Sequence, residues 1–238
     1  MKIDLHPCYV LHQRPYRETS LILDIFSLEY GRVDLIAKGV KRSKKGWVNI
    51  LQPAKKMELA WSARSEMGTL TAAETSETSP DIHGRGLLTV FYINELLIRM
   101  LHKHEPHSEL FDIYDSTLRL LSSEENPERI LRVFEKHLLN TLGYGLVLDH
   151  EPGTGAKIRR DVRYYYLLNH GPASIRPDVS GHVRISGEAL LALENEVAWN
   201  DDVAKEIKGL MRFILDEYTG DRPLESRALY KAYIRNAT

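Results

Sequence analysis

Along the first third of the chain, apolar and polar residues alternate in short runs. Leu21, Leu23 and Ile25 occupy every second position of one run, which is the period of a strand with one buried face. Similar patterns predict five strands, at residues 8–16, 20–27, 31–40, 50–62 and 68–77. Five short strands in so little chain favour a closed barrel, because closure removes exposed edges. We therefore expect residues 1–79 to form a five-stranded OB-fold β-barrel, with a plain sheet or an SH3-like barrel as the alternatives.

The third expected strand is bounded by a turn and by a basic segment. Gly31 lies in the turn before it, and glycine takes the positive φ that other residues resist. The basic side chains after the strand are Lys38, Lys41, Arg42, Lys44 and Lys45. This segment has too little apolar content to pack in a core, so we expect a mobile basic loop.

Near Pro80 the apolar spacing changes from that of strands to that of helices. Asn126 and Pro127 form a start signal, and Gly143 is placed to end the helix that follows. Asp201 and Asp202 are candidate caps of a later helix. The expected helices cover residues 87–104, 108–121, 127–142, 188–199, 201–218 and 224–235.

Residues 144–187 interrupt the helical pattern. Short apolar runs predict strands at 163–168, 173–175 and 182–185, separated by turns at Gly171-Pro172 and Pro177-Asp178. We therefore predict an α+β multidomain protein. An OB-fold nucleic-acid-binding domain covers residues 1–79, and an α-helical bundle with a small β insertion, at about residues 144–187, covers residues 80–238.

The chain has 238 residues, 43% of them apolar, which is enough for one large or two modest domains. Its formal net charge of −1 does not indicate a class of partner, but the charge is unevenly distributed. Residues 32–56 carry eight basic side chains and one acidic side chain, as a local binding surface would. The single cysteine, Cys8, rules out an intrachain disulfide framework. No secretory leader or membrane-length apolar run occurs, so we expect a cytoplasmic protein.

The basic segment and the end of the first strand make a candidate nucleic-acid surface. Cations follow phosphates, and aromatic faces such as those of Tyr16 and Trp47 stack on unpaired bases. A solvated charge run is the alternative interpretation. The candidate DNA-binding cations of the barrel are Arg14, Arg17, Arg32, Lys38, Lys41, Arg42, Lys44 and Lys45.

Other candidate chemistry is weak. The run HKHEPH at residues 102–107 has three histidines and a glutamate, but its spacing matches no hydrolase helix motif. Cationic side chains suit the end of a helix, which is the interpretation that we favour over a metal site. No nucleophile elbow, P-loop, dinucleotide-binding glycine motif or metalloprotease motif occurs in the sequence. We therefore expect no enzymatic activity and no cofactor.

The sequence resembles RecO, a family of bacterial recombination-mediator proteins in DNA repair. The barrel region is similar to the N-terminal domain of that family in three runs: RPYRETSLILDIF, the GR…AKG run at residues 31–39, and LQP at residues 51–53. The rest resembles its helical domain in YINELL at residues 92–97, in a stretch at residues 131–145 that ends in LGYG, and in GDRPLESRALY at residues 220–230. The resemblance spans almost the whole chain in the same order.

The resemblance implies an OB-fold followed by a helical bundle, binding to single- and double-stranded DNA, and annealing of complementary strands. It implies as partners RecR, single-strand-binding protein and, indirectly, RecA, whose loading the family assists. It also implies a cytoplasmic protein associated with the nucleoid. The residues alone leave open an RNA-binding OB-fold module and a metal-dependent hydrolase that uses the histidine cluster.

The chain departs from the family in one respect. Many relatives carry a four-cysteine zinc site after LGYG, beginning where this chain has His150, and no cysteine follows Cys8 here. A structural zinc site of this type needs all four ligands. We therefore expect no metal in the insertion, which must be held by packing and turns.

Three cations near the C-terminus, Arg212, Arg222 and Arg227, lie on or beside helices with apolar faces. Ordinary surface ion pairing explains them without any function. The alternative is a second positive patch that holds another DNA strand, as annealing requires.

The resemblance also suggests where a partner binds. Single-strand-binding protein offers a flexible acidic tail that ends in apolar residues and a free carboxylate, and such a tail needs an apolar groove with a cation at its rim. The candidate residues on the helix at 127–142 are Arg129, Arg132, Lys136, Leu139 and Leu142. Arginine pairs with a carboxylate through two hydrogen bonds, so Arg132 is the expected anchor. The alternative is that this helix is ordinary core.

Overall fold

The computed structural model describes residues 2–42, 46–63, 66–76, 79–123, 126–178, 180–220 and 222–237, apart from the side chains of residues 234, 236 and 237. The chain divides into two compact units. The first contains Met1–Pro127 and Pro223–Thr238, and the second contains Glu128–Arg222. The compact units therefore divide the chain differently from the predicted domain boundary at residue 79, because part of the helical region packs with the barrel.

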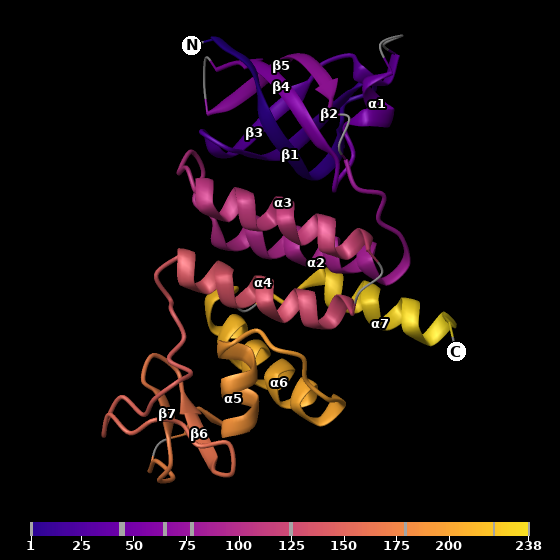
Figure 1. Cartoon of the computed structure of the whole chain (residues 1–238). Helices are drawn as coiled ribbons and strands as arrows, with labels where there is room; N and C mark the ends of the chain where they lie inside the picture. Colours follow the sequence, from indigo (N-terminus) through magenta and orange to yellow (C-terminus); the bar gives the residue numbers. More distant parts are fainter. Residues whose placement is uncertain are drawn as a thin grey trace. The chain divides into compact units, whose positions relative to one another are not determined.

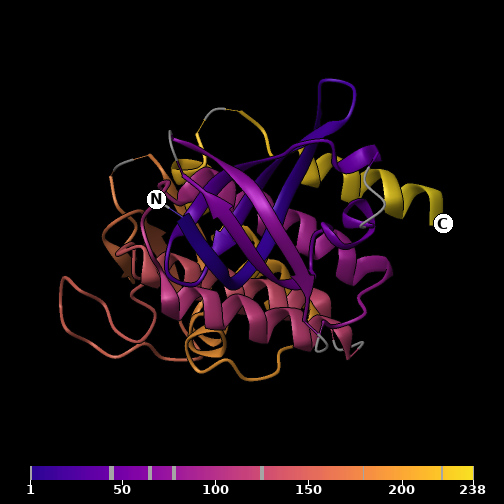
Figure 2. The same ribbon diagram turned by 90° about the horizontal axis from the view of Figure 1, so that it is seen from above.

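Five strands form a closed barrel in the order β1-β2-β3-β5-β4. The strands are β1 (Lys2–Tyr16), β2 (Ser20–Ser27), β3 (Gly31–Ala37), β4 (Lys56–Ser62) and β5 (Met67–Thr75). Neighbouring strands are antiparallel apart from β3 and β5, which are parallel. Figure 2 shows from above how the strands wrap around the barrel. The predicted five-stranded OB-fold barrel is confirmed.

The period-two pattern of the sequence becomes the two faces of each strand. Leu23, Ile25 and Leu35 are completely buried in the barrel core. β2 is buried on its other face as well, because Phe26 packs against Phe111 of a helix beneath the barrel, with 5.4 Å between ring centroids. This second contact explains why apolar residues also occupy positions of β2 that a half-exposed strand would leave polar.

The segment between β3 and β4 differs from the prediction. β3 ends at Ala37, since Gly39 turns the chain with φ 65° and Val40 is buried in the barrel core. A 3-10 helix, η1 (Val40–Arg42), and a short helix, α1 (Trp47–Ile50), replace the predicted ends of the two strands. Val40 therefore anchors the start of the basic segment, and the prediction of a wholly mobile loop is wrong for that part.

Besides α1, the described part of the first unit contains the longer helices α2 (Gly84–Met100), α3 (Ser108–Ser122) and α7 (Glu225–Ala237). Figure 1 shows α2 and α3 side by side beneath the barrel. α2 ends at Met100, before the HKHEPH run, because that run pairs with β3 instead. The backbone N–H of His104 donates to the carbonyl of Arg32 at 2.9 Å. The interpretation of the histidine run as a helix end is therefore wrong.

The second unit contains α4 (Pro127–Thr141), α5 (Gly187–Glu194) and α6 (Asp201–Tyr218), with a sheet in the order β7-β6-β8. The strands are β6 (Arg163–Leu167), β7 (Gly171–Ala173) and β8 (His182–Ser186). Gly171 and Pro172, expected as a turn, lie in β7, and the chain turns earlier at Asn169, which has φ 60°. The cap of α6 is Asn200, whose side chain accepts from two backbone N–H groups of the first turn, rather than Asp201 or Asp202.

Packing and hydrogen bonds hold the β insertion together. Tyr164, Tyr166 and Ile185 are buried on one face of the sheet. The carboxylate of Glu151, itself buried, accepts a hydrogen bond from the backbone N–H of Ser174 at 2.7 Å. This contact ties the loop before β6 to the chain after β7.

Candidate nucleic-acid interface

The turn between β1 and β2 and the segment after β3 lie together at one end of the barrel. The backbone N–H of Lys41 donates to the carbonyl of Thr19 at 3.0 Å, and that of Gly39 donates to Oγ of Ser20 at 3.3 Å. These bonds bring together two groups of cations that are separated in sequence. The cations are Arg14, Arg17, Lys38, Lys41 and Arg42, and all five are exposed.

The local backbone turns these side chains outward. Arg17 occupies the tight β1–β2 turn with φ 50°, and its guanidinium lies over the ring of Tyr16 at 5.3 Å from the centroid. Tyr16 and Trp47 are both half-buried, so part of each ring reaches the surface. A cation beside an exposed aromatic ring combines phosphate attraction with base stacking.

The charge at this end of the barrel is strongly positive. Residues 14–20 and 38–42 contain five cations and one acidic residue, Glu18. Glu18 lies 3.7 Å from Arg42, and both side chains are highly exposed, so solvent screens this pair and leaves the field of the cluster positive. The end of the barrel can therefore attract a polyanion.

The sequence matches two models of one family. "Recombination protein O N terminal" matches residues 1–79, and "Recombination protein O C terminal" matches residues 84–228. The chain belongs to the RecO family. Its relatives include the "DNA repair protein RecO" of Nitrosococcus oceani, 41% identical over 96% of this chain and 93% of that protein. The same protein of Photobacterium profundum is 40% identical over 98% of both chains. The predicted resemblance is confirmed, and the family gives this DNA-binding protein a role in recombinational DNA repair.

Among the described residues, no three His, Cys, Asp or Glu side chains are grouped so that they could hold a metal ion. In the same part of the chain, no helix has the length and apolar character that crossing a membrane requires.

Not all the predicted DNA-binding cations of the barrel join the cluster. Arg32 lies at the other end of β3, where its guanidinium donates to the carbonyl of Ile98 in α2. Beside Arg32, the ammonium of Lys103 binds the carboxylate of Asp34. Burial acts to raise the pKa of Asp34, but the contact with Lys103 helps to hold that pKa below its usual value. Arg32 therefore fastens the barrel to α2. Lys44 and Lys45 lie outside the described residues.

The three C-terminal cations lie in both units. Arg212 is exposed on α6 and forms an ion pair with Asp216 at 3.6 Å, and Arg222 is exposed after that helix. Arg227 belongs to α7 in the first unit, where its guanidinium lies over the ring of Tyr92 at 5.8 Å. Their role in holding a second strand stays a prediction.

The predicted tail-binding cations of α4 are engaged within the second unit. Arg132 is 9% exposed and pairs with the fully buried Glu135 at 2.6 Å. Lys136 is 7% exposed, donates to the carbonyls of Leu193 and Glu194, and pairs with Glu196 at 2.6 Å. Lys136 holds the end of α5 against α4, whereas Arg132 is paired within α4. Both contacts count against the prediction that these cations bind a partner's carboxylate.

The remaining members of that predicted set do not line the cavity nearest to them. Leu139 is fully buried and Leu142 is half-buried. The guanidinium of Arg129 donates to the carbonyl of Glu196 and lies 5.7 Å from the ring of Trp199. A cavity of about 340 Å³ is lined by Arg160, Glu188, Ala192, Val197, Ala198, Trp199, Asn200 and Val203.

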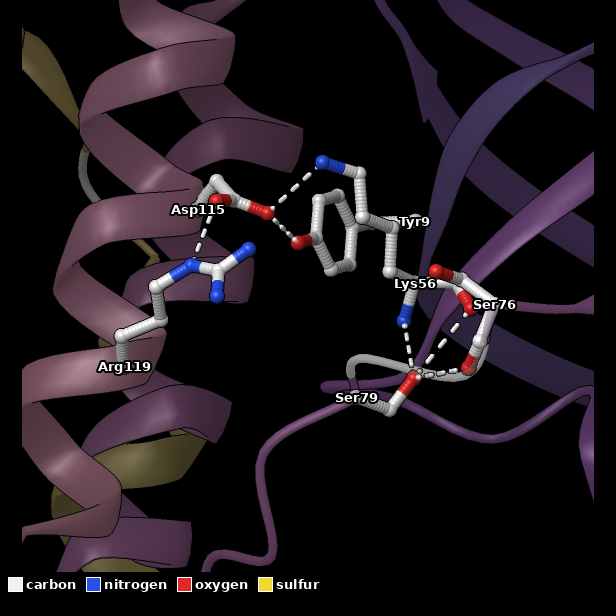
Figure 3. Close-up of polar contacts among 6 residues, drawn as sticks. All are labelled: Tyr9, Lys56, Ser76, Ser79, Asp115 and Arg119. Atoms are coloured by element: carbon white, nitrogen blue, oxygen red, sulfur yellow. Dashed lines mark hydrogen bonds and ion pairs between the residues drawn. The ribbon is translucent and has the colours of Figure 1, made fainter.

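Sequence reasoning missed a polar cluster between the barrel and α3. Figure 3 shows Asp115 accepting from the Tyr9 hydroxyl, from Nζ of Lys56 at 3.0 Å and from Nε of Arg119 at 2.9 Å. Burial acts to raise the pKa of Asp115, but these bonds outweigh it and hold the pKa below its usual value. Only the i,i+4 spacing of Asp115 and Arg119 was visible in the sequence.

Replacing Asp115 by Asn should destabilise the protein by about 1.5–3 kcal/mol at pH 7, the range for hydrogen bonds to a charged group. Because the folded-state pKa is lowered, this stabilisation is fully present above about pH 4 and is lost as the pH falls through the folded pKa. Urea unfolding at pH 7 and pH 3 measures it. Asp112→Asn, at an exposed position of α3, is the control. A cost that is the same at both pH values would contradict the prediction.

Proposed function

We propose that this chain is a recombination mediator that anneals complementary single strands and, with RecR, helps to load RecA on DNA coated by single-strand-binding protein. The observation that carries the proposal is the cluster of five exposed cations at one end of an OB-fold barrel, in a chain of the RecO family. Each cation that replaces a condensed counterion adds to the affinity for any sequence. A mediator acts in this way by holding strands, without a chemical step.

Annealing requires two strands to be held at the same time. The barrel cluster supports one of them. Arg212 and Arg222 of the second unit are the proposed contacts for another strand, and Arg227 of the first unit is a separate candidate contact. Arg212 and Arg222 are exposed, and the ion pair of Arg212 with Asp216 is long and solvated, so a phosphate can replace the carboxylate at little cost.

Single-strand-binding protein is proposed to dock through its acidic tail. Arg129 is better placed than Arg132 to be the tail's cation, because Arg129 is only half-buried and lies over the ring of Trp199, which lines the cavity. Arg132 would have to leave Glu135, a fully buried carboxylate, without its pairing cation.

The proposed function is tested by annealing fluorescently labelled complementary oligonucleotides coated with single-strand-binding protein. The wild-type chain should accelerate annealing, and a variant without the barrel cations should not. An RNA competitor that removes the protein from DNA more effectively than equal DNA would favour the RNA-binding alternative. Failure of the wild-type chain to anneal coated strands would overturn the proposal.

A further inference from the structure

The small sheet of the second unit has two faces of different character. In antiparallel strands, residues opposite one another point to the same side. Tyr164 and Ile185 are opposite and are buried, whereas Tyr165 is opposite Arg184, and Leu167 is opposite His182. The second face is therefore partly exposed and combines apolar, aromatic and basic side chains.

Tyr165 lies at the centre of this outer face. The guanidinium of Arg184 lies over its ring at 5.9 Å from the centroid, and the ring of His182 meets it edge-on at 5.2 Å. The three side chains come from two neighbouring strands, β6 and β8, so the sheet fixes their spacing. Rigid placement lowers the entropy cost of binding a ligand.

The charge around the sheet favours an anionic ligand. Residues 157–187 contain six Lys and Arg against two Asp. Arg163, at the end of the outer face, pairs with Glu206 of α6 at 2.9 Å, and Arg159 pairs with Asp161 at 2.7 Å. Among the described residues, Arg184 has no carboxylate within ion-pair distance, and its side chain is exposed.

We infer that the outer face of this sheet, centred on Tyr165 and Arg184, is a second binding site for single-stranded nucleic acid. A single strand offers both phosphates for the cations and open base faces for the tyrosine ring, whereas a duplex hides its base faces. An acidic peptide would supply negative charge, but it lacks the series of unpaired base faces that stack on an aromatic ring. The inference takes its ligand from the proposed function, but its observations are independent of the barrel.

Photocrosslinking tests the site in the full-length chain. An oligo-dT strand carrying 5-iodouracil is irradiated with the protein, and the crosslinked peptides are identified by mass spectrometry. We expect crosslinks in the peptide containing Tyr165, and these should persist when Arg14, Arg17, Lys41 and Arg42 of the barrel are replaced by Ala. Crosslinks confined to the barrel, or crosslinks at Tyr165 that form equally with duplex DNA, would overturn the inference.

Binding measurements provide the second readout. In the barrel variant, Tyr165→Leu combined with Arg184→Glu should lower the remaining affinity for oligo-dT about tenfold or more, the effect of losing one stacked base and one cation. Lys205→Glu on α6, an exposed position of the same unit, is the charge control. Circular dichroism shows whether each variant is folded. An unchanged affinity in the folded double variant overturns the second site, whereas crosslinks at Tyr165 and none in the barrel of the wild-type chain would overturn the proposed barrel interface alone.

Discussion

Replacing Arg14, Arg17, Lys41 and Arg42 by alanine is expected to weaken binding of single-stranded DNA by about 10²–10³-fold at about 0.1 M salt. The four side chains are exposed at one end of the barrel, so each can release about 0.7 counterion on meeting a single strand. The plot of log affinity against log salt should become shallower by about 3. Fluorescence anisotropy with oligonucleotides of unrelated sequence measures both quantities. The loss of affinity should be similar for each sequence, because every strand has the same phosphate backbone.

The matched control removes four exposed cations elsewhere: Lys2, Arg85, Lys205 and Lys208. It changes the net charge by the same amount, so it separates local contacts from the general attraction of a basic protein. We expect it to leave the salt slope nearly unchanged. If both quadruple variants shift the slope equally, the barrel cluster is not the interface.

Asn94→Leu is expected to destabilise the protein by about 2–5 kcal/mol, because two buried groups lose their hydrogen-bond partner at once. Nδ2 of Asn94 donates to the carbonyl of Leu11 in β1 at 2.9 Å, and Oδ1 accepts from the hydroxyl of Tyr114 at 2.7 Å. Asn94 is 2% exposed and Tyr114 is fully buried, so water cannot replace the lost bonds without opening the core. Urea unfolding of the full chain measures the change.

The companion variant Tyr114→Phe tests the reason for that cost. Phenylalanine removes the hydroxyl that donates to Oδ1 of Asn94. Its own cost should therefore be much smaller in the Asn94→Leu background, where that hydrogen bond is already lost, than in the wild type. Additive costs of the two substitutions would show that the hydrogen bond between them contributes little.

The sequence predicts the barrel well because its strands follow a local rule. The period-two spacing of Leu21, Leu23 and Ile25 is a property of nearby residues, and it predicts the strand correctly although β2 is buried on both faces. The strand end at Ala37 could not be found in this way, since it depends on Val40 turning back into a core formed by distant strands. The five barrel cations were found from charge alone, but the hydrogen bonds that bring them together join segments about twenty residues apart.

The predicted site on α4 shows where sequence reasoning fails. The spacing of Arg132 and Lys136 correctly places both on one helix, but it does not show what faces them. Lys136 binds carbonyls at the end of α5, more than fifty residues later. Arg132 binds Glu135, which is only three residues away, and the i,i+3 spacing could have indicated that pair.

The N-terminus of α7 is capped by a side chain from much earlier in the chain. The carboxylate of Glu95 accepts from the backbone N–H groups of Glu225 and Ser226 at 3.0 and 2.9 Å, and from the Ser226 hydroxyl at 2.6 Å. All of the second unit is synthesised between these residues. On the ribosome, the face of α2 that packs against α7 therefore stays exposed to solvent while the second unit is synthesised. It can be covered only after α7 itself has been translated.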